Sequence, residues 1–193
     1  MATARRMGPK GSEIWHSMLD AAEEILRDEG YGALTSRRVA ECIDVKQRLV
    51  YYYFRTMDEL IVETFQRLAT RELQRLEAAL ESDHTLREIW DVCVRTADTK
   101  LVSEFMALAN RIEGLRKEVK EYIRKSRALQ VAALARPMRS VGLDTAMAPE
   151  AAAIFATSAA LALHREAEIG ISNGHAEVMN VIDGLIAKLD PES

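Results

Sequence analysis

The sequence contains few of the residues that interrupt helices or cross-link small folds. Its 193 residues include only four prolines, nine glycines and two cysteines. No apolar run approaches the ~18 residues that a membrane-spanning helix needs, so we expect no membrane partner. Two distant cysteines exclude a disulfide-stapled scaffold, and we expect Cys42 and Cys93 to be reduced core residues of a cytoplasmic chain.

The signatures of common enzymes are also missing. The four histidines, at positions 16, 84, 164 and 175, are scattered, and no pair has the spacing of metal ligands. There is no glycine-rich phosphate loop and no nucleophile with a recognisable base, so we expect no cofactor. A helical enzyme therefore stays only as an alternative.

Helical periodicity runs along almost the whole chain, which predicts an all-α fold. Ser12 is suited to cap the first helix and Gly30 to end it. Pro137 is expected to kink or end a body helix, and Pro149 to begin one. Further helices are expected after Thr35, after Asp44-Val45, and near 58–80, 85–96, 100–112, 115–139, 149–169 and 175–189.

Charge is unevenly distributed along the chain. The formal net charge is −4, yet residues 35–57 carry five basic side chains against two acidic ones. A short basic segment on an acidic chain suits a protein that contacts a polyanion at one end. The N-terminal residues Arg5, Arg6 and Lys10 belong to an arm that either reaches DNA or has no role, and their surroundings do not resemble a signal peptide.

Residues 33–54 predict two short amphipathic helices joined by about three residues, which is a helix-turn-helix pattern. Helices this short are unstable alone, so the preceding helix and the long helix after Phe54 must hold them in place. The residues spaced to pack inward are Val39, Ala40, Ile43, Val45, Val50 and Phe54.

From about Ser12 to Phe65 the chain resembles the tetracycline-repressor (TetR) family. The residues that carry the resemblance are Leu19-Asp20-Ala21-Ala22, Gly30-Tyr31, Leu34-Thr35, Val39-Ala40, Val45, the Tyr51–Phe54 block and Asp58-Glu59-Leu60. The resemblance implies a three-helix DNA-binding head (residues 1–57) and a helical ligand-binding and dimerisation body (residues 58–193). It implies a transcription regulator, a repressor released from a palindromic operator by a small molecule, although the sequence does not decide whether ligand releases or promotes binding.

Carried over position by position, the resemblance assigns DNA contacts to both motif helices. Thr35 or Ser36 caps the first motif helix and meets a phosphate, and Arg37 reaches a base or a phosphate. The recognition helix begins at Lys46, where Gln47 suits adenine, Arg48 suits guanine and Leu49 suits a thymine methyl. Tyr51 and Tyr52 resemble the family's aromatic phosphate contacts, whereas packing is the alternative for this aromatic run and the expectation for Phe54.

Four positions depart from the family pattern. Asp44 replaces a turn glycine, which is tolerable because Asp accepts left-handed geometry. Lys46 replaces a hydroxyl residue, and Arg48 stands where small residues are common. Met57 replaces a phosphate-contacting lysine, so one contact is in doubt and a helical adaptor without DNA binding is the second alternative.

The body is expected to dimerise through helices at about 149–169 and 175–189. Eight alanines, Ala156 and Ala160 among them, permit close helix approach in the first of these helices. Together the two helices of each subunit could form a four-helix bundle about a two-fold axis, which is also the family's usual interface. An ordinary intramolecular helix pair is the alternative.

A ligand pocket is expected in the body from the resemblance, with an apolar or aromatic effector of unknown identity. Asn110, Arg111, Glu113 or His164 could supply polar contacts, and the long helix at 58–80 could couple the pocket to the head. For each pocket residue taken singly, a place in the core is the favoured interpretation. The expected lining residues are Trp90, Cys93, Phe105, Met106, Ala109, Asn110, Tyr122 and Phe155.

Overall fold

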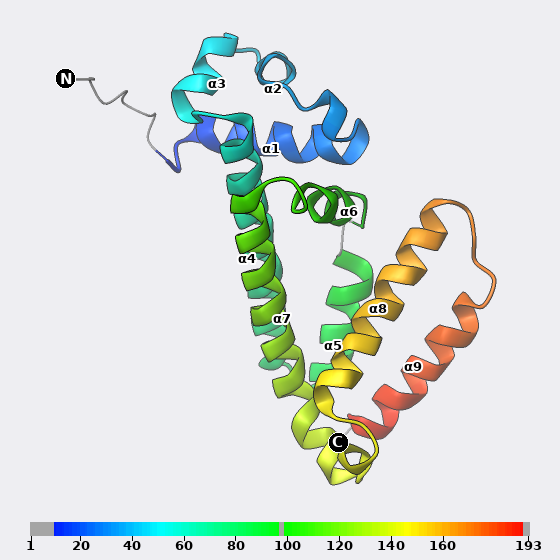
Figure 1. Ribbon diagram of the computed structural model, residues 1–193. Helices are drawn as coiled ribbons and strands as arrows, with labels where there is room; N and C mark the ends of the chain where they lie inside the picture. Colours follow the sequence, from blue (N-terminus) through cyan, green and yellow to red (C-terminus); the bar gives the residue numbers. More distant parts are fainter. Residues whose placement is uncertain (1–9, 97–98, 191–193) are drawn as a thin grey trace. The chain divides into compact units, whose positions relative to one another are not determined.

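The computed structural model describes residues 10–96 and 99–190 of the chain. This part is helical and contains no strand, which confirms the predicted all-α fold (Figure 1). Among these residues, no helix combines the length and the apolar character needed to cross a membrane. The predicted contacts of Arg5 and Arg6 lie outside the described residues, whereas Lys10 pairs with Glu63 at 2.6 Å.

The helix boundaries follow the predicted ones closely. The helices are α1 (Glu13–Asp28), α2 (Ser36–Cys42), α3 (Gln47–Tyr53), α4 (Met57–Leu80), α5 (Thr85–Asp91), α6 (Thr99–Leu108), α7 (Glu113–Ser140), α8 (Pro149–Glu168) and α9 (His175–Leu189). The predicted helix at 85–96 changes after α5 into a π-helical turn, Val92–Thr96. Pro137 does not end α7, which continues to Ser140, whereas Pro149 does begin α8.

The chain forms two compact units whose limits differ from a boundary at 57/58. The first unit comprises the residues up to Ala69 together with Lys100–Lys120, and the second comprises Thr70–Thr99 and the residues from Glu121 on. The predicted head therefore shares its unit with the first turns of α4, with α6 and with the start of α7. Two seven-residue helices bury too little apolar surface alone, so they depend on these neighbours.

The core of the first unit forms around α1. Ser12 caps this helix, because its hydroxyl accepts a hydrogen bond from the Trp15 amide at 3.3 Å. Its buried face includes Met18 and Leu19, and the Trp15 ring stacks on Phe54 with centroids 6.4 Å apart. Arg67 of α4 adds an ion pair to Glu23 at 2.7 Å. The end of the recognition segment is thus fixed to the longest apolar face of the unit.

The second unit has its own apolar cluster, formed by Leu76, Ala79, Leu86, Ile89 and Ala133. The start of α5 is tied to α9, since the Leu86 amide donates to Asp190 at 3.1 Å and Arg87 pairs with Asp183. Helices α8 and α9 run antiparallel (Figure 1), and His175 lies 3.0 Å from Glu166 across their connection.

One core prediction was wrong. Cys42 is exposed, because it lies at the side of the short helix α2, whose inward face is formed by Ser36, Val39 and Ala40. Cys93 is partly buried, and both thiols are free.

Candidate nucleic-acid interface and apolar cavity

Helices α2 and α3 are joined by a tight turn, Ile43–Lys46. Asp44 adopts φ 51°, the only positive φ of a non-glycine residue in the described ranges, so its predicted left-handed geometry is confirmed. The Val45 amide donates to the Ala40 carbonyl at 2.9 Å and closes the turn. Lys46 then occupies the N-cap of α3 without a side-chain capping bond, as its lack of a hydroxyl dictates.

The two candidate capping residues of α2 have different roles. The Thr35 hydroxyl is the cap, and it accepts a hydrogen bond from the Arg38 amide at 3.1 Å. Ser36 is only 4% exposed, so direct phosphate contact does not fit its position. The sequence-based role of Ser36 is corrected here, because the first residue of α2 points inward against α3.

Ser36 instead bridges two residues of the recognition helix. The Gln47 side-chain amide donates to the Ser36 hydroxyl at 2.9 Å, and that hydroxyl donates to the Tyr51 hydroxyl at 3.0 Å. Gln47 and Tyr51 are four residues apart and share one face of α3. Sequence reasoning missed this bridge, although the i,i+4 spacing was a signal that could have suggested it.

The outer face of α3 carries polar and aromatic groups. Tyr51 and Tyr52 are 41% and 40% exposed, whereas Tyr53 and Phe54 are buried. Lys46 and Arg48 are exposed, and no hydrogen bond or ion pair holds either side chain to another described residue. Leu49 is partly buried. Two unpaired cations beside two phenol groups form a surface suited to phosphate oxygens and base edges.

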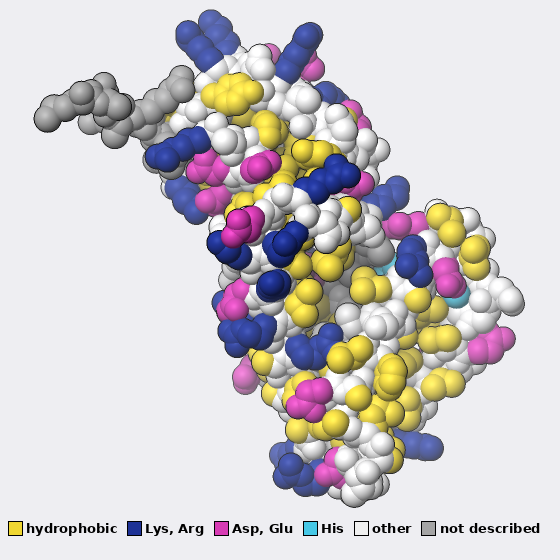
Figure 2. Space-filling model, viewed as in Figure 1, with side chains coloured by type: hydrophobic (Ala, Val, Ile, Leu, Met, Phe, Trp, Pro, Cys, Tyr) yellow, Lys and Arg dark blue, Asp and Glu magenta, His cyan; other side chains and the backbone are white. Residues whose placement is uncertain are grey.

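The arginines of α2 are both paired in the free chain. Arg37 is exposed and bonds Glu41 one turn later at 2.8 Å, so the exchange of this partner for a phosphate would cost little. Arg38 bonds Glu29 at 2.7 Å and thereby lowers the pKa of that carboxyl. Arg38 fixes α2 to the end of α1. Figure 2 shows Lys and Arg side chains projecting over α2 and α3.

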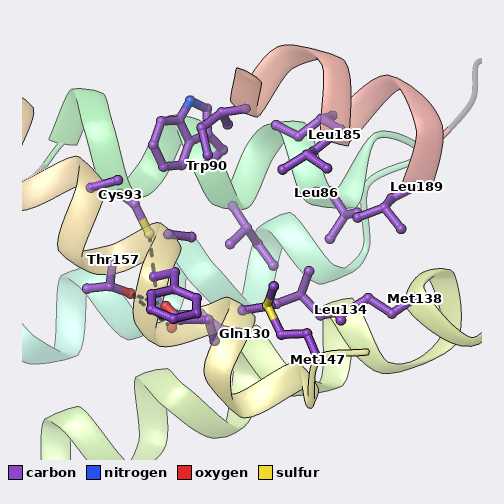
Figure 3. Close-up of a pocket in the computed structure, with 18 of the residues that line it drawn as sticks. Leu86, Trp90, Cys93, Gln130, Leu134, Met138, Met147, Thr157, Leu185 and Leu189 are labelled. Atoms are coloured by element: carbon purple, nitrogen blue, oxygen red, sulfur yellow. Dashed lines mark hydrogen bonds between the residues drawn. The ribbon is translucent and has the colours of Figure 1, made fainter. Parts of the chain in front are cut away.

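The second unit contains a partly open apolar cavity of about 360 Å³ (Figure 3). In the close-up, side chains from α5, α7, α8 and α9 point toward a common space, among them Trp90, Leu134 and Leu185. Neither an acidic nor a basic side chain is among the described residues that line it. Its wall consists of Leu86, Ile89, Trp90, Cys93, Gln130, Leu134, Met138, Leu143, Met147, Ala152, Ala153, Phe155, Ala156, Thr157, Ala159, Ile182, Leu185, Ile186 and Leu189.

One end of the cavity is polar. The Gln130 amide donates to the Cys93 sulfur at 3.7 Å, and the Thr157 hydroxyl donates to the Gln130 carbonyl oxygen at 3.3 Å (Figure 3). Burial raises the pKa of the Cys93 thiol to about 11, and burial together with the Glu72 carboxylate raises the pKa of Tyr122 to about 12. Both groups are therefore neutral near pH 7.

Three of the eight predicted pocket residues line this cavity: Trp90, Cys93 and Phe155. Tyr122 belongs to the same unit but not to the wall. The structure places the other four in the first unit, where Phe105 packs against Phe65 with ring centroids 5.2 Å apart and Ala109 is buried. Met106 and Asn110 are exposed. Helical periodicity identified a buried face in this region, but it could not show which neighbour that face meets.

Sequence reasoning missed most of the cavity wall. Gln130 was the detectable signal, because it is a polar residue on an otherwise apolar face of α7 that includes Leu134 and Met138. The alanines of α8 at positions 152, 153, 156 and 159 also line the space. Their small side chains leave room for the cavity inside the unit.

Residues 18–64 match the family model described as bacterial regulatory proteins, tetR family. This segment of the chain therefore resembles the helix-turn-helix region of the tetR family. A relative from Xanthobacter autotrophicus, an uncharacterized HTH-type transcriptional regulator in the dhlA 5′ region, is 31% identical over 134 residues. That alignment covers 61% of this chain and 63% of the relative, which is less than two thirds of the relative's length.

Solved structures of other regulators share the fold along nearly the whole chain. A TetR transcription regulator from Haloarcula marismortui has a TM-score of 0.70 at 17% identity, covering 92% of this chain and 96% of its own. A putative transcriptional regulator from Saccharomonospora viridis, in complex with choline, has a TM-score of 0.71 at 12% identity, covering 92% and 94%. These similarities confirm the predicted all-α fold class, and the family-model match over residues 18–64 confirms the N-terminal helix-turn-helix.

Proposed function

We propose that this chain is a DNA-binding transcription regulator that reads its operator with the exposed face of α3. The observation that carries the proposal is the exposed group Lys46, Arg48, Tyr51 and Tyr52, presented by a helix whose opposite face is buried. The match of residues 18–64 to the tetR family model supports the same function. The N-terminal end of such a helix is the part that reaches base edges in the major groove.

Within this proposal, each residue has a role that suits its side-chain chemistry. Arg48 donates to guanine and Gln47 contacts adenine, while Leu49 meets a thymine methyl. Lys46, Tyr51 and Tyr52 bind phosphates, joined by Thr35 and Arg37 from α2. Met57 begins α4 and offers no charge, so no phosphate contact is proposed there.

We further propose that two copies bind together through α8 and α9. Both helices expose apolar stripes: Ile154, Phe155 and Leu161 on α8, and Val178, Val181 and Leu185 on α9, with exposed fractions of 36–64%. Figure 2 shows hydrophobic side chains gathered over these helices. A two-fold pair would present two recognition helices to a palindrome with half-site centres about 34–36 Å apart.

The cavity is the proposed ligand site, and the regulator is proposed to be a repressor that its ligand releases. An almost wholly apolar wall with a small polar end is typical of small-molecule sites. A ligand shifts the equilibrium only by its difference in affinity for the two states. Helix α4 begins in the first unit and ends in the second, which makes it the proposed route of coupling. The S. viridis neighbour is in complex with choline, which is a cation. Because no acidic residue is among the described residues that line this wall, a cationic ligand of that kind is not proposed here.

A gel-shift with DNA fragments flanking the chain's own gene tests DNA binding. We expect a specific complex that Arg48→Ala or Gln47→Ala weakens by about 1–3 kcal/mol, with a relaxed preference at one base position. Lys46→Ala should weaken binding to all DNA sequences alike. It should also reduce the slope of log affinity against log salt concentration by about one. Arg124→Ala, which removes an exposed arginine of α7, is the matched control and should bind normally.

If no fragment is bound, or if none of the α3 variants differs from wild type, the recognition-helix proposal is wrong. A folded dimer without any DNA binding would favour the adaptor alternative, for which the methionine at position 57 is the motivating observation.

A further inference from the structure

Buried nitrogen atoms without partners are concentrated in the second unit. Among the described residues, the buried side-chain nitrogens without a hydrogen-bond partner are Trp90 Nε1, Arg127 Nε and Nη1, and His164 Nε2. A buried donor that makes no hydrogen bond is costly, and a guanidinium costs more than a neutral group. These nitrogens are therefore candidates for hydrogen bonds to a ligand.

Arg127 lies on the cavity-facing side of α7. It precedes Gln130 by three residues and Leu134 by seven, and both of those residues line the cavity. Side chains at these spacings share one helix face. The position is consistent with the electrostatics, because the positive charge of Arg127 lowers the pKa of the Cys93 thiol against the effect of burial.

His164 occupies the corresponding side of α8. It follows Thr157 by seven residues, and the Thr157 hydroxyl contacts Gln130 of α7. Ala160, one turn before His164, is 1% exposed, so this face of α8 is buried along its length. Beyond the Gln130–Thr157 contact, the polar groups toward this end of the two helices are Ser126, Arg127 and His164. Ser126 accepts a hydrogen bond from Gln130 at 3.5 Å, whereas nitrogens of Arg127 and His164 have no partner.

Glu72 is a carboxylate that acts on the groups around Arg127. It acts on both Cys93 and Tyr122, and Arg75 binds it at 2.6 Å. Among the described residues, none makes a hydrogen bond to Arg127 Nε or Nη1. Two guanidinium nitrogens are thus without hydrogen-bond partners one turn beyond Gln130, whereas the cavity wall itself offers only apolar surface and neutral dipoles.

We propose that the ligand of this cavity is an amphipathic monoanion, a carboxylate with an apolar body. The carboxylate accepts hydrogen bonds from the Arg127 guanidinium, with the His164 ring as a second donor, and the body lies among Trp90, Leu134 and Leu185. This inference rests on the proposed ligand role of the cavity and narrows its ligand class. It does not depend on DNA binding.

Calorimetric titration of the full chain at pH 7 with octanoate, octan-1-ol and octylamine tests the ligand class. The three probes share one apolar body and differ in the charge of the head group. A charge-assisted hydrogen bond should make octanoate bind about tenfold or more tightly than octan-1-ol, with octylamine weakest. Arg127→Gln should reduce octanoate affinity to that of the alcohol and leave the alcohol unchanged.

Arg124→Gln is the matched control, because it removes a positive charge from the exposed side of α7 one turn away. It should bind octanoate as wild type does. Equal affinities for acid and alcohol would overturn the inference and leave an apolar ligand site intact. Absence of binding by all three probes would overturn it too, while the gel-shift on the same protein tests DNA binding separately. If Arg127→Gln fails to fold, the comparison of the three probes on the wild-type chain still tests the preference for a carboxylate.

Discussion

Helices α1 and α9 are similar in length but differ in what covers them. Of the sixteen residues of α1, eight are buried, among them Met18, Leu19 and Ala22. None of the residues of α9, all of which are described, is buried, although the helix carries Val181, Leu185 and other apolar side chains. The chain itself covers one face of α1, whereas it covers α9 only in part, through residues such as Ile186 and Leu189.

This difference extends to the units that contain the two helices. The first unit buries its apolar faces and exposes a polar surface on α3. The second unit leaves apolar stripes on α8 and α9 and an apolar space within it. Large exposed apolar patches mark interaction surfaces. The apolar face of α1 is thus covered within the chain, whereas apolar stripes of α8 and α9 remain exposed.

The largest effect should come from a charge placed on the uncovered helix. Val181 is 62% exposed, so Val181→Glu should fold normally as a single chain. In a two-fold pair the substitution buries two carboxylates, and we expect dimer affinity to fall by at least about 100-fold. Sedimentation equilibrium measures the loss, and operator affinity should fall with it.

Asn180→Glu is the control, because it adds the same charge to a neighbouring exposed position outside the Val178–Val181–Leu185 stripe. An intact Val181→Glu dimer would exclude this face as the interface. The alanines at positions 156 and 160 are less suitable sites, since Ala156 lines the cavity and Ala160 is buried within its own chain.

A smaller expected effect distinguishes the partly buried Cys93 from the exposed Cys42, because Cys93 makes stability depend on pH. Burial raises the pKa of Cys93 from 9.0 to about 11, so the folded chain holds a proton that the unfolded chain releases. The resulting stabilisation is complete below pH 9 and is lost as pH rises to about 11, by at most about 2–3 kcal/mol.

Chemical unfolding of wild type and Cys93→Ala between pH 8 and 11 measures this loss. The variant should lack the part of the alkaline slope that Cys93 supplies. At pH 8 a thiol reagent should modify the exposed Cys42 well before Cys93. Equal modification rates at both positions would contradict the burial of Cys93.

The smallest effect concerns the hydroxyl that connects α2 to α3. Ser36→Ala removes two hydrogen bonds, and water can replace them at the exposed Tyr51 and Gln47. We expect a stability loss of only about 0.5–1.5 kcal/mol, but a relaxed base preference opposite Gln47.

A double-mutant cycle with Gln47→Ala measures the coupling. If Ser36 acts by orienting Gln47, the two substitutions should be non-additive in operator discrimination. Full additivity would mean that Ser36 contributes to packing alone.

Local chemistry explains how much of the fold could be predicted. Ser12, Asp44 and Pro149 each act within one turn of their own position, and the predicted cap, left-handed turn and helix start are all confirmed. Pro137 was predicted to kink or end α7. The helix continues past it to Ser140, so the proline does not end the helix.

The cavity was harder to predict because it depends on contacts between distant segments. Periodicity shows that Phe105 has a buried side, but its partner Phe65 is forty residues away in sequence. The prediction that Cys42 is a core residue was wrong for a local reason. A helix of two turns has too few residues for its apolar pattern to define one inward face. The Ser36 bridge combines both problems, because it is a contact between two short helices.

Pro137 also affects how the cavity can open. Because proline has no amide hydrogen, the carbonyl of Ala133 lacks the donor that a helix normally supplies four residues later. The last turn of α7 is therefore attached by one backbone hydrogen bond fewer, and it carries Met138, a fully buried residue of the cavity wall. This turn is therefore the part of the α7 wall that the helix's own backbone hydrogen bonds restrain least.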